Sequence, residues 1–327
     1  MGDGLIQTSA RRAFPALGRD LGRVGLGTVR FRLGGERQRE AFEVMDAWLE
    51  AGAELIDTAA VYAAGEAERV VGAWLAATGA RDRVVLLTKG AHPDEHWRSR
   101  LTPGSIAADL TSSLERLGAD AVDIFMVHRD DPAVPVGEIV DALDAQVLAG
   151  RTRTVGASNW TPARLESAAA YATARGRTTL TSSSVYFGLA EAVQPYTPGC
   201  VDAWDAGSRG WYTDSQERWP LFAWSAQSGG FFADDFDPAK AAPEAVDSWD
   251  TAANRARRQR ARELGFERGL SAAQVALAYV LEQPFRPFAL CGARSAAGVS
   301  AVMAALDIRL SQADLRWLAT GERQLLP

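Results

Sequence analysis

The 327-residue sequence is 47% hydrophobic and 23% charged, with a formal net charge of −6 at neutral pH. A chain of this length and composition can bury a large core and remain soluble. Because it is mildly acidic and has no basic block, we expect neither nucleic acid nor an acidic membrane surface as a partner.

From about residue 23 onward, short β-branched apolar runs alternate with longer amphipathic stretches. The apolar runs predict strands over 24–27, 54–57, 84–88, 122–127, 154–157, 180–184, 221–224 and 288–291. The amphipathic stretches predict helices over 37–51, 66–78, 105–117, 136–149, 161–175, 254–264, 271–282 and 296–305. Eight alternations with almost wholly apolar strands indicate a parallel sheet that is covered on both faces.

The loop after the first strand decides between a barrel and a doubly wound sheet. A doubly wound sheet normally carries a glycine-rich phosphate turn at this point, and Gly22, Gly25 and Gly27 do not make that pattern. The sequence therefore predicts one domain over residues 1–327, with a (β/α)8 TIM-barrel fold and an N-terminal extension. An extra helix over 311–324 is expected outside the barrel repeat.

Two segments lack regular periodicity. Residues 194–219 carry four large aromatic side chains, Trp204, Trp211, Tyr212 and Trp219. We expect these side chains to pack their loop against the barrel rather than to bind substrate. Residues 233–250, rich in Asp, Ala and Pro, are expected to form an exposed loop after the seventh strand.

The cysteine content and the absence of targeting signals predict a cytoplasmic protein. Cys200 and Cys291 make no disulfide framework, which fits a reducing compartment. No apolar run approaches the length of a membrane span, and no apolar segment follows the Arg11-Arg12 pair.

Four reactive side chains stand at or just after the carboxyl ends of three adjacent predicted strands. Asp57 ends the second strand, and Tyr62 follows five residues later in the same loop. Lys89 follows the third strand and His128 follows the fourth. In an α/β barrel the loops after the strands build the active site at one face, so we expect these four side chains to meet.

Each of the four has a plain structural interpretation, such as a turn cap for Asp57 or a core position for His128. The composition of the chain favours a functional interpretation of these residues. The chain has only two lysines, Lys89 and Lys240, and only one of its three histidines follows an apolar strand. A lysine retained in an arginine-rich chain indicates a need for a compact amine.

Together the four groups suit the reduction of a carbonyl. A phenol is protonated near neutral pH and can donate its proton to a carbonyl oxygen that gains negative charge. A nearby ammonium is expected to lower the pKa of the Tyr62 phenol, and a carboxylate keeps that ammonium charged and oriented. A neutral imidazole can orient the carbonyl. None of these groups supplies a hydride, so the chemistry implies an organic reductant.

The segment from Ile56 to Tyr62 (IDTAAVY), with residues 65–68 after it, resembles the signature of the aldo-keto reductase family around its catalytic Asp and Tyr. Lys89 and His128 match the other two members of the family's tetrad. The resemblance extends over roughly residues 23–303. It implies an (α/β)8 barrel, aldehyde, ketone or sugar carbonyl substrates, and a nicotinamide hydride donor, with NADP(H) favoured and NAD(H) possible.

The resemblance also implies a cofactor site. Gly27 and Thr28 match the loop near the nicotinamide, Ser158 and Asn159 the pair that binds the carboxamide, and Trp224 the stacking aromatic. The pyrophosphate loop is matched by 225–232, which contains Ser225 and Gly229. The 2′-phosphate site is matched by Gly292, Arg294 and Ser295.

Three departures from the family pattern affect the cofactor site. Ser183 stands where the family usually has a Gln that contacts the carboxamide. Gly298 replaces a common Arg or Gln, and Ala301-Val302 replaces a Glu-Asn pair that contacts adenine. We therefore expect weaker NADPH binding, and less discrimination against NADH, than is usual in the family.

The substrate is not legible from the sequence, although Trp97 and Arg129 are candidates for lining a pocket suited to a polar, ring-shaped molecule. The leading interpretation is carbonyl reduction; oxidation of a sugar or polyol, or a non-catalytic cofactor-sensing subunit, are the alternatives. No metal is expected, because His92 and His96 flank Pro93 in a loop. The oligomeric state is not predicted.

Overall fold

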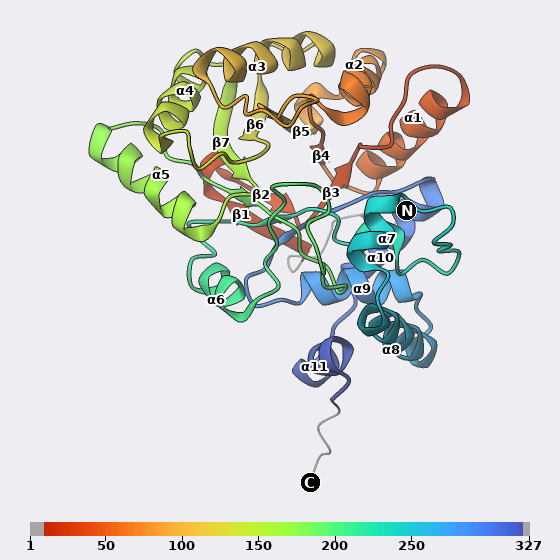
Figure 1. The fold of residues 1–327 in the computed structure, drawn as a ribbon. Helices are drawn as coiled ribbons and strands as arrows, with labels where there is room; N and C mark the ends of the chain where they lie inside the picture. Colours follow the sequence, from red (N-terminus) through yellow and green to blue (C-terminus); the bar gives the residue numbers. More distant parts are fainter. Residues whose placement is uncertain (1–9, 323–327) are drawn as a thin grey trace.

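The computed structural model describes residues 10–322, and eight parallel strands form a barrel at its centre (Figure 1). The strands are β3 (Val24–Gly27), β4 (Leu55–Asp57), β5 (Val85–Gly90), β6 (Val122–Val127), β7 (Thr152–Ser158), β8 (Ser183–Ser184), β9 (Phe222–Ala223) and β10 (Phe288–Cys291). Their hydrogen-bonded order is β8-β7-β6-β5-β4-β3-β10-β9. A parallel bridge between Ser183 and Leu221 joins the two outer strands, so the sheet closes and the predicted fold is confirmed.

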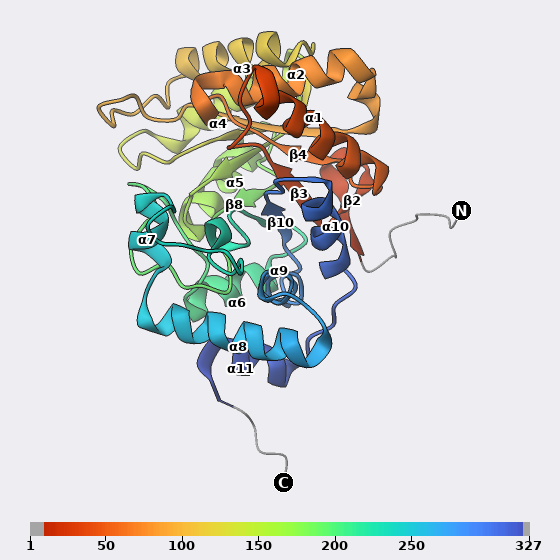
Figure 2. The same cartoon turned by 90° about the vertical axis from the view of Figure 1, so that its right-hand side faces the viewer.

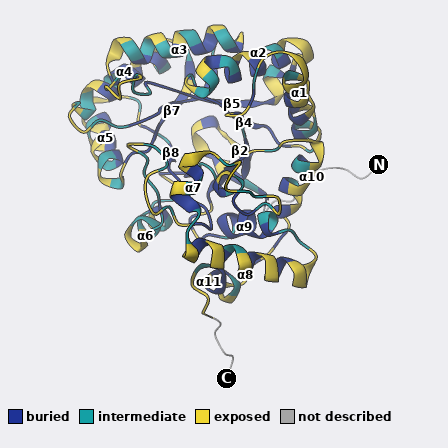
Figure 3. Ribbon diagram, turned by 45° about the vertical axis from the view of Figure 1, so that its right-hand side comes forward, coloured by how far each residue is buried: buried dark blue, intermediate teal, exposed yellow. Residues whose placement is uncertain are grey.

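Helices cover the outer face of the barrel and side chains fill its interior, so strands such as β5 and β6 are buried along their whole length (Figure 3). The surrounding helices are α1 (Gly35–Glu50), α2 (Glu66–Thr78), α3 (Pro103–Leu117), α4 (Val136–Leu148), α5 (Pro162–Arg175), α6 (Ala206–Asp214), α9 (Ala272–Leu281) and α10 (Ala296–Ala305). Their starts follow local chemistry: Thr102 and Thr161 cap α3 and α5, each with a proline in the first turn. A capping box starts α9 at Ser271.

The N-terminal extension folds into a hairpin of β1 (Arg11–Phe14) and β2 (Arg19–Gly22), which the sequence pattern did not predict. Its apolar residues Phe14, Leu17 and Leu21 pack with inward-facing strand residues in a core of their own. Phe14 meets Phe222 and Phe288 edge to face, with ring centroids 5.7 and 6.0 Å apart. The hairpin therefore fills the end of the barrel opposite the carboxyl ends of the strands.

Helices α8 (Ala252–Arg268) and α11 (Gln312–Thr320) lie outside the barrel repeat. Helix α8 packs against α9, and α11, the predicted extra helix, packs against α8 (Figure 2). Within residues 10–322, no helix is long and apolar enough to span a membrane.

The loop over 233–250 is more ordered than expected. Residues 234 and 235 are exposed as predicted, but α7 (Pro243–Trp249) follows them, and Trp249 is buried. Its ring stacks on Tyr196 and also contacts Tyr186, each at a centroid distance of 5.2 Å. A single aromatic residue at the end of a short polar helix is a weak sequence signal, so the exposed-loop prediction is wrong for this part.

The barrel plug gives a stability prediction. Phe14→Ala should lower the free energy of unfolding by about 3–5 kcal/mol, because it leaves a cavity among rigid aromatic neighbours. The measurement is the urea denaturation midpoint followed by tryptophan fluorescence. Phe266→Ala is the matched control, since Phe266 is 91% exposed on α8 and its loss should leave the midpoint almost unchanged. Equal midpoints for the two variants would contradict a plugging role for the hairpin.

Candidate active site

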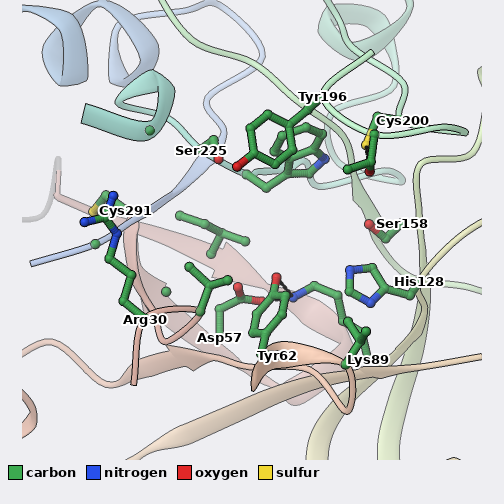
Figure 4. Close-up of a pocket in the computed structure, with 18 of the residues that line it drawn as sticks. Arg30, Asp57, Tyr62, Lys89, His128, Ser158, Tyr196, Cys200, Ser225 and Cys291 are labelled. Carbon is green, nitrogen blue, oxygen red and sulfur yellow. Dashed lines mark hydrogen bonds and ion pairs between the residues drawn. The ribbon is translucent and has the colours of Figure 1, made fainter. Parts of the chain in front are cut away.

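A cavity of about 420 Å³ opens at the carboxyl ends of the barrel strands (Figure 4). Seven of the eight strands place a lining residue at or just after their ends: Gly27, Asp57, Lys89, His128, Ser158, Trp224 and Cys291. The predicted convergence of the four reactive residues is present, because Tyr62 also lines this cavity.

Lys89 is the centre of the cluster and is 1% exposed. Its ammonium donates to Asp57 Oδ1 at 2.5 Å, to the Thr58 carbonyl at 3.0 Å and to Tyr62 Oη at 3.3 Å. An ammonium has three N–H donors, so all three are used. Asp57 and Thr58 come from the end of β4 and Lys89 from β5, whose register pairs Asp57 with Leu87. Neighbouring parallel strands thus fix the lysine against its carboxylate.

Charge and burial oppose one another in this cluster. Burial disfavours the Lys89 ammonium, but the adjacent Asp57 carboxylate and the Tyr62 oxygen outweigh it and raise the lysine pKa, so the side chain stays charged. For Tyr62, burial raises the phenol pKa and Lys89 offsets only part of that effect. The net direction corrects the sequence-based expectation of a lowered pKa. At neutral pH the phenol keeps its proton.

His128 is held as a neutral imidazole. Its pKa lies well below the ordinary value because the ring is buried and because Arg129, Lys89 and His92 add positive charge nearby. Its Nδ1 atom is buried without a hydrogen-bond partner. The His128 ring meets Tyr62 edge to face at a centroid distance of 5.8 Å. A neutral ring nitrogen beside the phenol can therefore share one ligand atom with it.

Asn159 joins the ends of three strands. Its side-chain amide donates to the His128 carbonyl at 3.2 Å and to Ser158 Oγ at 3.0 Å, and its oxygen accepts from the Val201 amide and Trp224 Nε1, both at 3.2 Å. These four bonds use the full capacity of the amide. Asn159 therefore orients its neighbours. Ser158 donates to the Ser184 carbonyl and retains an oxygen lone pair toward the cavity.

One wall of the cavity is built from small residues, among them the predicted Ser225, Gly229 and Gly292. In the loop after β9, residues Ser225, Ser228, Gly229 and Gly230 have φ values of 50°, 49°, 62° and 95°. Turns of this kind can direct main-chain N–H groups at an anion, although the amides of Ala226, Ser228 and Gly230 already donate to main-chain carbonyls. Arg294 lies at the rim, exposed, with Nη1 3.6 Å from Asp235 Oδ2.

Three predicted cofactor residues do not line the cavity. Ser183 is fully buried, and its hydroxyl bonds Tyr212 Oη at 2.8 Å on the helix side of β8. Because side chains alternate along a strand, Ser184 faces the other way, and its buried Oγ has no partner. Thr28 is buried and bonds the Asp57 carbonyl, and Ser295 caps α10 by accepting from the Gly298 amide. Ser183 and Thr28 thus lie outside the cavity lining, their predicted cofactor contacts stay predictions, and Ser295 supports the start of a helix.

Trp97 and Arg129, the predicted substrate residues, both line the cavity. Trp97 adopts φ 58° and its ring lies 5.7 Å from that of His92. His92 in turn meets His128 at 5.1 Å. The four aromatic residues expected to pack their loop, 204, 211, 212 and 219, are absent from the described lining and contact the core, as predicted.

Five further lining residues carry weak sequence signals: Arg30, His92, Tyr196, Cys200 and Trp249. Arg30 follows β3 by three residues, and Figure 4 shows it extending toward Cys291, beside the segment that carries Arg294. Its position a few residues after a strand end could have identified Arg30 as a site residue, since the same signal identified Tyr62. The others lie on long loops or a short helix, whose course depends on tertiary packing.

A model of the aldo/keto reductase family matches residues 23–201 and 211–319, most of the chain. The chain belongs to the aldo/keto reductase family. The barrel with this tetrad at its carboxyl end agrees with that membership. As a member of this family the protein is an oxidoreductase.

Relatives agree with the assignment. The uncharacterized oxidoreductase YrpG of Bacillus subtilis is 29% identical over 90% of this chain and 90% of its own length. The aldo-keto reductase YhdN of the same organism is 34% identical, but the match spans only 44% of this chain and 45% of that protein. A solved aldo/keto reductase from Klebsiella pneumoniae, in complex with NADP and acetate, is 25% identical and covers 91% of this chain and 90% of its own, with a TM-score of 0.67. Membership of the family and the NADP complex of the Klebsiella protein support binding of a nicotinamide cofactor.

The lowered pKa of His128 gives a pH prediction for this aldo/keto reductase. In ¹³C-histidine-labelled protein, the His128 ring should keep the chemical shifts of a neutral imidazole at the pH where an ordinary imidazole is half charged. The reason is that protonation would place a cation in a buried site beside other positive charges. His128→Asn assigns the resonance by its disappearance. A titration midpoint at or above the ordinary value of about 6.5 would contradict the electrostatic description of the site.

Proposed function

We propose that the protein reduces an aldehyde, ketone or keto-sugar carbonyl to an alcohol with NADPH as the favoured cofactor. The single observation that carries the proposal is the saturated Lys89 ammonium between Asp57 and Tyr62, in a cavity that is also lined by His128. This arrangement presents a protonated phenol and a neutral imidazole to one ligand atom. Both groups favour an oxygen that gains negative charge.

The residues of the cavity fit a nicotinamide cofactor. The positive-φ loop over 225–230 and the start of α10 offer main-chain N–H groups to phosphates, and Arg30 and Arg294 add positive charge on the same side. Trp224 presents a half-buried ring to the cavity, held by its bond to Asn159. Ser158 can accept from a carboxamide. We assign cofactor binding to these residues together with Gly27, Ser225, Gly229 and Gly292.

In the proposed reaction the cofactor, when bound, supplies a hydride to the carbonyl carbon and the protein supplies the proton. Tyr62 donates its proton to the carbonyl oxygen, which gives the alcohol and a phenolate, and Lys89 at 3.3 Å stabilises that phenolate until a proton from solvent restores it. Asp57 keeps Lys89 charged and aimed, and His128 orients the carbonyl through a hydrogen bond. Each proposed role follows from a contact or from a place in the cavity lining.

Sugar or polyol oxidation is the reverse of this reaction and would use the Tyr62 phenolate as its base. The site holds the phenol, because burial raises the pKa of Tyr62. The second alternative, a cofactor-sensing subunit without catalysis, needs no ordered proton donor. The complete hydrogen bonding of Lys89 argues for catalysis. Single-domain organisation and a cytoplasmic location remain predictions of the sequence.

Tyr62→Phe tests the proton donor. Turnover should fall by about 10²–10⁴-fold, because the variant keeps the ring and loses only the acidic hydroxyl. Cofactor binding, followed by quenching of tryptophan fluorescence, should stay close to that of the parent protein and serves as the folding control. Rates within about threefold of the parent enzyme over a panel of aldehydes, ketones and keto-sugars would contradict the assignment.

The cofactor preference depends on Arg294. Its ion pair with Asp235 places a carboxylate where a 2′-phosphate would approach, so we expect only a modest preference for NADPH over NADH. Arg294→Ala should lower the ratio of NADPH affinity to NADH affinity by up to about tenfold and leave NADH binding almost unchanged. Asp235→Asn should raise that ratio. Fluorescence titration of both reduced cofactors measures the ratio, with Arg177→Ala on the far outer surface as control. Tight NADPH binding that survives Arg294→Ala would place the phosphate elsewhere.

A further inference from the structure

Arg129 is a buried cation without a carboxylate partner at the wall of the cavity. The residue is only 8% exposed, and it directly follows His128. Its Nη1 donates to the His128 carbonyl and its Nη2 to Thr197 Oγ1, both at 2.9 Å, while its Nε atom is buried without any partner. A guanidinium has five N–H donors, so these bonds use two of them. Among residues 10–322, no Asp or Glu forms an ion pair with it.

Other buried arginines in the structure lie away from the cavity. Arg12 and Arg23 lie at the opposite end of the barrel and donate to main-chain carbonyls there, and their Nε atoms, like that of Arg129, have no partner. Arg257 is paired with Glu191 at 2.9 Å. Arg129 differs because it lines an open cavity and keeps one uncommitted N–H on each Nη.

The nearby carboxylates are already engaged. Asp130, the next residue along the chain, pairs with Arg164 at 3.1 Å. Asp57 is the only acidic residue among the described lining of the cavity, and Lys89 holds it. The cavity is therefore positively charged beyond what its own acids neutralise. A buried charge without a counter-ion is costly, so such a charge at a binding site indicates an anionic ligand group.

The position of Arg129 separates this charge from the proposed cofactor phosphates. Arg129 lies close enough to Tyr62, His128 and His92 to influence the charge state of all three. Thr197 and Gly199 cover its side chain, with a Cβ at Gly199 placed 3.6 Å from Arg129 Cδ. Arg30 and Arg294, by contrast, belong to the wall formed by 291–294 and the loop after β9.

We propose that the substrate is an oxo acid, an aldehyde or ketone that also carries a carboxylate, and that Arg129 is the residue that selects it. The inference rests on the proposed carbonyl reduction at the same site. Arginine binds a planar carboxylate with parallel N–H donors, and each Nη of Arg129 keeps one N–H uncommitted for this. The rings of Trp97, His92 and Tyr196 line the same space and favour a flat substrate. The product is then a hydroxy acid.

The test uses matched pairs of charged and neutral substrates with the full-length protein and NADPH. The probes are 2-, 3- and 4-carboxybenzaldehyde, each against its methyl ester, and 4-oxobutanoate against its methyl ester. For at least one pair, kcat/KM for the acid should exceed that for the ester by about tenfold or more. Arg129→Gln should bring this ratio close to one, mainly through KM, and Arg129→Lys should keep an intermediate ratio because it retains the charge but not the planar donors.

Controls keep the outcomes distinct. Arg218→Gln makes the same substitution at an exposed position outside the lining and should leave the ratio unchanged. Fluorescence titration of cofactor binding shows whether each variant folds, and the acid-to-ester ratio cancels any general loss of rate. A ratio near one in the parent protein, or a ratio unchanged in Arg129→Gln, would overturn the inference while carbonyl reduction stands.

Two further results are informative. If neither acids nor esters nor other carbonyl compounds are reduced by the parent protein, the proposed function itself fails. A preference for 4-formylphenyl phosphate over every carboxylate, lost in Arg129→Gln, would overturn the assignment of the anion as a carboxylate.

Discussion

The buried ion pair between Lys89 and Asp57 is the interaction on which the rest of the site depends. Both side chains are almost wholly buried, and removing either partner would leave an uncompensated charge in the barrel, at a cost of about 3–5 kcal/mol. The pair is tolerable because every N–H of the ammonium is bonded and because two adjacent strands fix the geometry. It also places a positive charge at 3.3 Å from the Tyr62 hydroxyl. The proposed proton donor therefore takes its position and its stabilised phenolate from the same contact.

Strain around the cavity is concentrated where the barrel strands end. Within residues 10–322, seven of the eight non-glycine residues with positive φ follow barrel strands on this face: Ala63, Ala64, Ala91, Trp97, Asn159, Ser225 and Ser228. Such conformations are costly and persist only where the surrounding structure imposes them. The opposite end of the barrel is filled by the hairpin and its aromatic contacts. One end thus provides rigidity, and the other can hold strained loops around a ligand.

Electrostatics divides the cavity into two regions. Arg30 and Arg294 add positive charge at the wall of small residues, and Arg129 adds it beside His128, while Asp57 is neutralised by Lys89. Burial, together with the nearby charges of Arg129 and Lys89, keeps the His128 imidazole neutral. A cavity of this kind can attract an anionic cofactor and an anionic substrate.

The sequence by itself determined the alternation of strands and helices, the barrel, and the convergence of Asp57, Tyr62, Lys89 and His128 at one end of it. These depend on local periodicity and on strand ends, which a sequence pattern records directly. Other features were decided only by tertiary structure. The two-residue strand β8 is too short for a pattern to show that Ser183 faces a helix and Ser184 the barrel. The ring of Trp249 reaches the cavity from a distant helix, and the absence of a counter-ion for Arg129 depends on where Asp130 turns. The direction in which the Tyr62 pKa shifts also depends on tertiary structure. Burial raises it, and burial is a property of the packed chain that no spacing in the sequence measures.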